Sequence, residues 1–267
     1  MTPSPGHIGS DLQRAADALI ARAGSLAHTM HLLATTTSTN DEAKWAAKAG
    51  ARHGEVWVAE EQTSGRGRQG RSWQSAGGES LLFSVLLRVE CPAAHLPPVA
   101  LAAGLSVRDA VAAAAPRAEV AIKWPNDVLA SGRKVAGILV EAAIAGPRVE
   151  SIVVGIGINV LTHGFDGDLS ERATSIAIVT GHPPDRAELL VDVLSRLEAD
   201  FDAVTAAGLG PFAGRLASAD ALYGRRVRSD TAEEGVACGI DEVGRLLVRR
   251  DDDALARWSS GEVHLVR

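Results

Sequence analysis

At 267 residues the chain can form one sizeable core and a small second unit, but not several full domains. Its 27 Lys and Arg and 33 Asp and Glu leave a formal charge of −6, which argues against a broad electrostatic grip on nucleic acid. Cys91 and Cys238, the two cysteines, lie in no metal-ligand spacing, so neither a disulfide framework nor a zinc site is expected. No apolar run approaches the roughly 18–20 residues of a membrane span, and no signal peptide opens the chain. We therefore predict a cytoplasmic protein without a membrane partner.

The first half of the chain alternates between helical and strand patterns. Apolar residues at helical spacing predict a lead-in helix, and Thr39 with Glu42 matches a capping box at the start of the next helix. A stretch rich in Gly, Arg, Ser and Gln is typical of a loop. In chain order we expect helices at 10–24 and 39–50, a strand at 55–60, a loop at 62–78, a strand at 80–89 and an Ala-rich helix at 99–115.

The second half is dominated by short apolar runs that are separated by turn residues, among them Ser131-Gly132 and Gly146-Pro147. This pattern indicates consecutive hairpins, and therefore an antiparallel or mixed sheet. We expect strands at 121–123, 128–130, 134–145 and 149–159, a loop at 162–170, an amphipathic helix at 185–207, and short strands at 226–228, 235–240, 246–249 and 262–266. The last four strands indicate a small barrel. We place a domain boundary near residue 220, which divides the chain into 1–219 and 220–267.

The segment from Gly65 to Arg71 carries three arginines interleaved with three glycines, and Trp73 closes it. Glycines allow a backbone to approach a ligand closely, and guanidinium groups donate several hydrogen bonds to a carboxylate or phosphate. The segment lacks the Gly-Lys-Ser/Thr ending of a phosphate-binding P-loop. Taken alone, it is equally typical of a solvated basic loop or of an Arg-Gly tail that binds nucleic acid.

The chain has only four lysines, and two of them, Lys123 and Lys134, each begin a short motif. The first begins Lys123-Trp124-Pro125-Asn126-Asp127, and the second begins the largely apolar run from Lys134 to Glu141. A lysine at the start of a buried strand places its compact ammonium at the rim of a sheet, where it can approach a ligand. The alternative is an ordinary Pro-Asn-Asp turn with two exposed lysines.

In two further stretches, polar side chains lie next to strand glycines or at the start of a predicted helix. The segment Gly155-Ile156-Gly157-Ile158-Asn159 is an apolar strand with two glycines and a terminal amide. Such glycines indicate the close approach of a ligand or, as often, a bulge or tight packing. The segment Ser38-Thr39-Asn40 precedes a predicted helix, where these residue types most often only cap the helix.

Four motifs follow one another along the chain: Ser38-Thr39-Asn40, Gln62 to Arg71, Lys123 to Asp127, and Lys134 to Glu141. Their order and spacing resemble the biotin–protein ligase family. The resemblance implies an α+β fold with a mixed, largely antiparallel sheet flanked by helices, related to class II synthetase cores, and a small SH3-like C-terminal β-barrel. It also implies an enzyme that activates biotin with ATP as biotinyl-5′-AMP and transfers the biotin to a lysine of a carboxylase carrier domain.

The resemblance also implies a role for individual residues of these motifs. Lys134, Arg66 and Arg68 would act in catalysis, beside the reacting carboxylate and the α-phosphate. The implied biotin-binding residues are Ser38, Thr39, Asn40, Gln62, Gly65, Arg66, Gly67, Arg68 and Lys134. The implied ATP-binding residues are Arg68, Trp73, Lys123, Asn126, Asp127 and Asn159. The Gly-Arg-Gly-Arg part would be a loop that orders over biotin and its adenylate.

The same resemblance sets expectations for cofactors and partners. Biotin would be a substrate, ATP and Mg²⁺ would be required, and no ligands are assigned to the metal. The expected partner is a biotin carboxyl carrier protein or domain. Too little chain precedes Ser38 for the winged helix-turn-helix of bifunctional members, so we expect a ligase that does not bind DNA. We also expect a monomer or weak homodimer. Lipoate or octanoyl transfer is the enzymatic alternative, and the Gly-Arg-Gly-Arg segment with the C-terminal barrel favours biotin.

Overall fold

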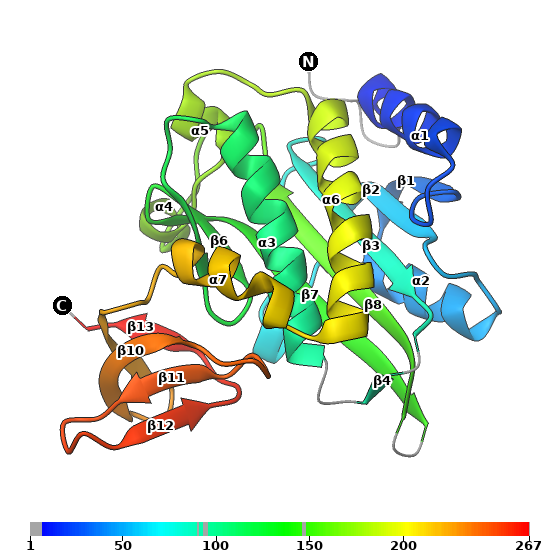
Figure 1. Cartoon of the computed structure of the whole chain (residues 1–267). Coiled ribbons are helices and arrows are strands. Elements are labelled where there is room, and N and C mark those ends of the chain that lie inside the picture. Colours follow the sequence, from blue (N-terminus) through cyan, green and yellow to red (C-terminus); the bar gives the residue numbers. More distant parts are fainter. Residues whose placement is uncertain (1–6, 90, 93–95, 146–147, 267) are drawn as a thin grey trace.

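The computed structural model describes residues 7–89, 91–92, 96–145 and 148–266, which form two sheets with helices packed against the larger one (Figure 1). The helices are α1 (Ser10–Arg22), α2 (Thr39–Lys48), η1 (Arg68–Gly70), α3 (Leu96–Ala114), α4 (Leu169–Arg172), α5 (Ile176–Thr180), α6 (Arg186–Ala207), η3 (Gly210–Phe212) and α7 (Ala213–Ala219). The strands of the larger sheet are β1 (Met30–Thr36), β2 (Val56–Gln62), β3 (Ser80–Leu87), β4 (Cys91–Pro92), β5 (Val120–Lys123), β6 (Asp127–Ala130), β7 (Arg133–Ala145) and β8 (Arg148–Asn159). The strands of the smaller sheet are β9 (Arg226–Ser229), β10 (Glu234–Ile240), β11 (Leu246–Arg249), β12 (Leu255–Trp258) and β13 (Val263–Leu265).

The larger sheet has the strand order β1-β2-β3-β8-β7-β6-β5, with β4 paired to β8. β1 and β2 run parallel, and the other strand pairs of this sheet are antiparallel. Ser131 and Gly132 have φ values of 49° and 77°, which suits the tight turn that joins β6 to β7. The predicted α+β fold with a mixed, largely antiparallel sheet is confirmed.

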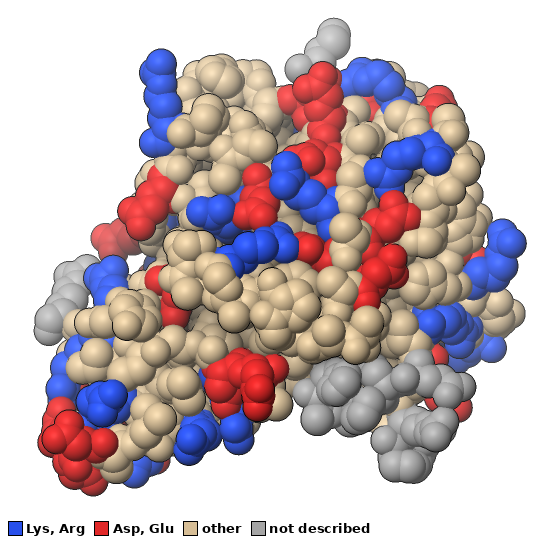
Figure 2. All heavy atoms as spheres, in the orientation of Figure 1, with Lys and Arg blue, Asp and Glu red and all other residues tan. Residues whose placement is uncertain are grey.

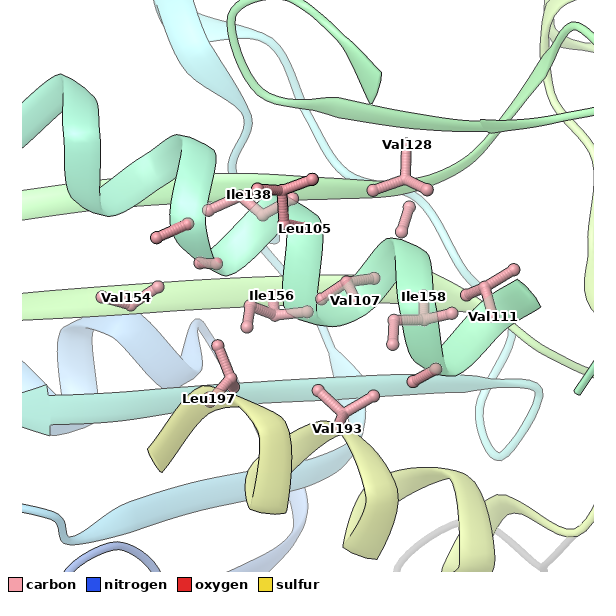
Figure 3. Packing of buried hydrophobic residues seen from close by; sticks show 14 of the residues in the cluster. Leu105, Val107, Val111, Val128, Ile138, Val154, Ile156, Ile158, Val193 and Leu197 are labelled. Carbon is pink, nitrogen blue, oxygen red and sulfur yellow. The ribbon is translucent and has the colours of Figure 1, made fainter. Parts of the chain in front are cut away.

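One face of the larger sheet is covered by α3 and α6, which enclose the main core (Figures 1 and 3). Side chains alternate between the two faces of a strand, so every second residue of β8 lies under these helices. Figure 3 shows this packing for Val154, Ile156 and Ile158 of β8, Ile138 of β7, Leu105, Val107 and Val111 of α3, and Val193 and Leu197 of α6. The intervening residues of β8 face the other side, where the predicted site residues lie.

α3 is, within the described part of the chain, the one helix whose length and apolar composition would allow it to cross a membrane. Most of its residues are buried, and it packs against α6 and against β5, β6 and β7. Its apolar character therefore serves the core. The absence of a membrane partner stays a prediction.

α1, α6 and β2 meet at a buried cluster of charges. The Arg186 side chain is 3% exposed, and it donates to Asp11 Oδ2 at 2.7 Å and to Glu60 Oε2 at 2.8 Å. The Glu60 side chain is 4% exposed, and its Oε1 also accepts the backbone N–H of Gly9 at 2.8 Å. The buried carboxylate of Glu60 is thus fully compensated, which makes the cluster costly to break.

The smaller sheet, here called the C-terminal sheet, has the strand order β12-β11-β10-β9-β13. All four strand pairs are antiparallel. β12 and β13 end this order, so the strands form an open sheet, as in an SH3-like domain, and not the closed barrel expected. The sheet is anchored to the larger one by the buried Trp124, whose Nε1 donates to the carbonyl oxygen of Gly244 at 2.9 Å.

Several elements differ from the sequence-based expectation. β1, α5, α7 and β12 were not predicted, and α4 begins at the end of the segment 162–170 that was predicted to be a loop. The expected capping box of Thr39 and Glu42 is wrong. Ser38 is the N-cap residue without a side-chain cap, and Glu42 accepts the hydroxyl of Thr36 at 2.6 Å instead. The predicted turn at Gly146 and Pro147 lies outside the described residues.

Candidate active site

Glycines of β8 form the floor of the site, on the sheet face opposite α3 and α6. A Cβ atom at Gly155 would lie 2.1 Å from Asn40 Oδ1, and one at Gly157 would lie 2.6 Å from Trp73 Cε2. Any larger residue would collide with these two side chains. The two glycines therefore allow α2 and the loop that joins β2 to β3, which carries Trp73, to approach the same stretch of sheet.

The N-terminus of α2 carries a compact polar cluster next to this floor. It is formed by Ser38, Thr39, Asn40 and Gln62 and is here called the α2 cluster. Ser38, Thr39 and Asn40 are all at most 4% exposed. Gln62, at the end of β2, accepts the backbone N–H of Thr39 at 2.7 Å and its hydroxyl at 3.1 Å through Oε1. Ser84 Oγ, on β3, lies 2.8 Å from Thr39 Oγ1 and 2.6 Å from Asn40 Oδ1. Since the Oε1 atom of Gln62 is occupied, its amide nitrogen is the group that can turn to a ligand.

Asn40 is held at both ends of its side-chain amide. Its Oδ1 faces Ser84, and its Nδ2 donates to Glu141 Oε2 at 2.7 Å. Glu141 also accepts Lys44 Nζ at 2.8 Å and Arg66 at 3.0 Å. Ser84 and Glu141 were not among the predicted site residues, although Glu141 closes one of the four motifs. Asn40 therefore ties α2 to β7 in this structure.

Residues 63–79, between β2 and β3, are here called the Gly-Arg loop. This loop folds back on itself as a short hairpin. The backbone N–H of Trp73 donates to the carbonyl of Gly65 at 2.9 Å, and that of Gly67 donates to the carbonyl of Arg71 at 2.7 Å. A Cβ atom at Gly65 would lie 2.6 Å from the Trp73 carbonyl oxygen, so this crossing requires glycine. The structure thus presents the segment as an ordered loop that returns to the sheet at Trp73.

Lys134 meets this loop at the floor. Its Nζ lies 2.7 Å from Asp127 Oδ1 and 5.6 Å from the centre of the Trp73 ring. A Cβ atom at Gly137, which pairs with Gly157 across β7 and β8, would lie 3.1 Å from the same Nζ. The ammonium is therefore packed between the start of β6, the sheet and the loop, as expected for the rim of a buried sheet.

Arg68 links the loop to the second lysine motif. It donates to Asn126 Oδ1 at 3.2 Å, and Asn126 Nδ2 in turn donates to the carbonyl of Ile138 at 2.9 Å. Burial lowers the pKa of Arg68, although the charge of Asp127 opposes this shift. Burial also lowers the pKa of Lys123, again against Asp127. Partly desolvated cations of this kind favour the binding of an anion.

Asn159 stands apart from the other candidates. It is 4% exposed, and its Nδ2 donates to the carbonyl of Thr174 at 3.0 Å. The N–H of Thr174 donates to the carbonyl of Lys134 at 2.9 Å. Asn159 is therefore linked to the backbone of Lys134 through Thr174. The structure thus brings the loop, Lys123, Asn126, Asp127 and Lys134 together, places the α2 cluster on the same floor, and sets Asn159 behind it.

Two cavities border the site. One of about 520 Å³ lies between Arg68 and Gln69 of the loop and the C-terminal sheet, including Asp230 and Trp258. A smaller one of about 120 Å³ is lined by residues that include Lys123. Trp73 rests over Gly157, and its buried Nε1 has no hydrogen-bond partner within the described residues. The loop therefore covers the floor in this structure.

Comparisons with known proteins agree with this geometry. Residues 32–159 match the biotin/lipoate A/B protein ligase family, and residues 224–266 match the biotin protein ligase C-terminal domain. The chain is 38% identical to a biotin–[acetyl-CoA-carboxylase] ligase of Paracoccus denitrificans, over 82% of this chain and 93% of that protein. It is also 38% identical to the ligase of the same name from Mycobacterium tuberculosis, over 91% of both chains.

A solved structure supports the same relationship. The biotin protein ligase from Aquifex aeolicus in complex with biotin and ATP superposes with a TM-score of 0.76 at 30% sequence identity, over 90% of this chain and 99% of that one. The likeness includes both the larger sheet and the C-terminal sheet, because it extends over nearly the whole of each chain. The chain therefore belongs to the biotin protein ligase family.

Proposed function

We propose that this protein activates biotin with ATP to give biotinyl-5′-AMP and transfers the biotin to a lysine of a biotin carboxyl carrier domain. One observation carries the proposal. The Lys134 ammonium, held by Asp127, lies against Trp73 of the Gly-Arg loop, and Arg68 of the same loop binds Asn126. One loop and one lysine thus converge where a carboxylate and a triphosphate could be brought together.

The α2 cluster supports biotin at one end of the floor. The ureido group of biotin presents both a carbonyl oxygen and two N–H groups, so its site needs donors and acceptors together. At the buried start of α2 the amide nitrogen of Gln62 would donate to the ureido carbonyl, because its Oε1 already accepts from Thr39. The hydroxyl oxygen of Thr39 accepts from Ser84 and keeps a second lone pair that would accept a ureido N–H. Biotin lying from this cluster toward Lys134 would place its carboxylate beside the ammonium, with Gly65, Arg66 and Gly67 above it.

The cations at the other end suit adenylation. In this step a carboxylate oxygen of biotin forms a bond to the α-phosphorus of ATP, and the bond to pyrophosphate breaks. Lys134 and Arg68, with Lys123 nearby, offset the negative charge of the two anions that meet there, so that catalysis rests on placement and electrostatics. Trp73, Asn126 and Asp127 are positioned to hold the nucleotide, and Asn159 supports the backbone of Lys134.

Mg²⁺ fits this site only as a companion of the nucleotide. The described residues contain no group of three or more His, Cys, Asp or Glu side chains that could hold a metal ion. Mg²⁺ commonly keeps several waters and takes one or two carboxylates together with substrate phosphates. Asp127 is the carboxylate at the proposed phosphate position, and Mg²⁺ bound there with ATP would neutralise phosphate charge.

Transfer completes the proposed reaction. The neutral amine of the carrier lysine attacks the acyl carbon of the adenylate, the nitrogen loses one proton to water as the new amide bond forms, and AMP leaves with the bonding pair. The adenylate is a mixed anhydride that water hydrolyses, so a loop that covers the floor protects it until the amine arrives. Arg66 and Arg68 belong to that cover, and Asp127 would orient the amine.

The proposal extends to the setting of the enzyme. We propose a cytoplasmic monomer or weak homodimer that binds the carrier domain and neither DNA nor a membrane. The formal charge of −6 supports the absence of DNA binding, as do the basic and acidic side chains that are interspersed on the face in Figure 2.

Covalent transfer tests the proposed function directly. The protein is incubated with ATP, Mg²⁺, a biotin carboxyl carrier domain and either biotin or lipoate, and the mass of the carrier is measured. We expect one biotin per carrier, and no transfer to a carrier whose target lysine is replaced by arginine. Transfer of lipoate in preference to biotin, or no transfer of either, would refute the proposal.

A further inference from the structure

The tip of the Gly-Arg loop is fastened to the C-terminal sheet. Arg71 donates to both carboxylate oxygens of Glu262, and Gln69 Nε2 donates to Asp230 Oδ2 at 3.3 Å. Glu262 precedes β13 and Asp230 follows β9, so the two acids belong to neighbouring turns. They are joined to each other because the N–H of Glu262 donates to Asp230 Oδ2 at 3.4 Å.

Local backbone geometry holds the two acids together. Gly261 has a φ of 115°, in the region that favours glycine, and a Cβ atom there would lie 3.1 Å from Asp230 Oδ1. The turn before β13 can therefore approach Asp230 only with glycine at this position. Burial would raise the pKa of Glu262, but the Arg71 guanidinium holds it below its ordinary value. The acid therefore stays ionised while it is paired with Arg71.

The C-terminal sheet is itself fixed to the larger sheet without the help of the loop. Trp124 donates to the carbonyl of Gly244. Gly244 also lies close to α3, because a Cβ atom added to it would be 3.2 Å from Pro97 Cβ and 3.3 Å from Leu101 Cδ1. Ile122 of β5 also forms a parallel bridge with Asp220, just before this sheet. The two acids thus belong to a sheet that has its own contacts with the larger sheet, so the loop can open while the position of the acids is kept.

The three arginines of the loop have separate partners. Arg66 binds Asp41 and Glu141 beside α2, and Arg68 binds Asn126. Arg71 is the one that reaches the C-terminal sheet, and the proposed chemistry gives it no part. The loop is therefore held at its base by the larger sheet and at its tip by the smaller one.

We propose that Glu262 and Asp230 are positioning residues that act through Arg71 and Gln69 to keep the loop over the adenylate. This inference rests on the proposed function, since it names the elements that retain its intermediate. The C-terminal sheet then has a defined task, which is to hold the far end of the loop closed. The loop must still open in every turnover to admit biotin and the carrier lysine.

The exposure of the contact sets the size of the expected effect. The side chains of Arg71 and Glu262 are 54% and 30% exposed, so this ion pair stabilises the closed loop only weakly. Loss of the Arg71–Glu262 pair should speed the release of adenylate about three- to five-fold. A weak fastening suits a loop that opens in each catalytic cycle.

The test measures two rates in the full-length enzyme. Biotin-dependent exchange of pyrophosphate into ATP reports formation of the adenylate, and the appearance of free biotinyl-5′-AMP reports its release. We expect Glu262→Gln and Arg71→Gln to speed release while the exchange rate stays within two-fold of the wild-type rate. The double variant should release no faster than either single variant, because both remove the same contact. Reversing the pair with Arg71→Glu and Glu262→Arg together should restore slow release.

Asp251→Asn is the matched control. Asp251 pairs with Arg226 on the same sheet at 2.9 Å and does not touch the loop, so this variant should release adenylate at the wild-type rate. If the wild-type enzyme performs exchange but neither Glu262→Gln nor Arg71→Gln speeds release, the positioning role is overturned alone. If the wild-type enzyme performs no exchange, the proposed function falls and the positioning role falls with it. Should Glu262→Gln fail to fold, Arg71→Gln decides the outcome, because that residue lies on an exposed loop.

Discussion

Replacement of Lys134 by alanine should abolish nearly all adenylation and leave the fold intact. The ammonium lies 2.7 Å from Asp127 and 5.6 Å from the centre of the Trp73 ring, at the point where biotin and ATP are proposed to meet. Removal of one well-placed group that stabilises charge in a transition state typically lowers the rate about 10²–10³-fold, or roughly 3–4 kcal/mol. We expect Lys134→Ala to lose at least this much, because the reaction brings two anions together.

The same geometry predicts a small effect on stability. The Lys134 and Asp127 side chains are 35% and 24% exposed, and an ion pair of this kind contributes about 0–1 kcal/mol. The free energy of unfolding of Lys134→Ala should therefore lie within about 1 kcal/mol of the wild-type value. Lys134→Arg should rescue little activity, because a planar guanidinium does not fit where Gly137 and Trp73 crowd a compact ammonium.

Biotin-dependent pyrophosphate exchange and urea unfolding together check this prediction. The matched control is Lys48→Ala, which removes an exposed lysine at the end of α2 and should change neither quantity. An exchange rate for Lys134→Ala within ten-fold of wild type would refute the catalytic assignment. A loss of activity that tracks a loss of stability would show that the lysine serves the fold instead.

Further predictions follow from the loop, the floor and the buried charges. Arg68→Gly should release adenylate early, which is measured as increased biotinylation of bystander lysines. Gly157→Val should displace Trp73 and so raise the KM for ATP, and overpacking of this kind should lower the free energy of unfolding by roughly 1–3 kcal/mol. Arg186→Met should lower the free energy of unfolding in urea by about 3–5 kcal/mol. The exposed pair lost in Arg14→Gln should cost less than about 1 kcal/mol. Burial would raise the pKa of Asp11, but Arg186 holds it below its ordinary value. This carboxylate therefore stabilises the fold above its unfolded pKa of about 3.9, and that contribution should disappear in acid unfolding as the pH falls through the lower folded pKa.

Sequence patterns predicted the elements whose structure depends on near neighbours. The β6–β7 hairpin follows from Ser131-Gly132, and the start of α6 follows from Asp185, whose side chain accepts the N–H groups of Ala187 and Glu188. β1 was missed because all but the last two of its residues are half-buried, without the alternation that marks a strand. Its place is determined by parallel pairing with β2, which lies 26 residues away in the register Met30 to Val56.

The residue types of the site could be read from the motifs, but their tasks could not. Asn40 and Asn159 were both predicted to bind ligands, and in the structure each amide is bound by the protein. An amide that ends a strand or begins a helix serves a ligand or the scaffold equally well. The choice depends on residues such as Glu141 and Thr174, which become neighbours only when the sheet has formed.

The arginines of the Gly-Arg loop show most clearly that a local motif does not determine the partners of its residues. The alternation of glycine and arginine indicated a loop, and the family resemblance implied that this loop covers biotin and its adenylate and that Arg66 and Arg68 act there. In the structure Arg66 binds partners 25 and 75 residues away, Arg68 binds one 58 residues away, and Arg71 binds one 191 residues away. Each partner comes from a different part of the fold, so a local motif contains no information about which partner each arginine binds. The choice of partner depends on the assembled sheets, and substitution of one arginine at a time would separate the contribution of each contact.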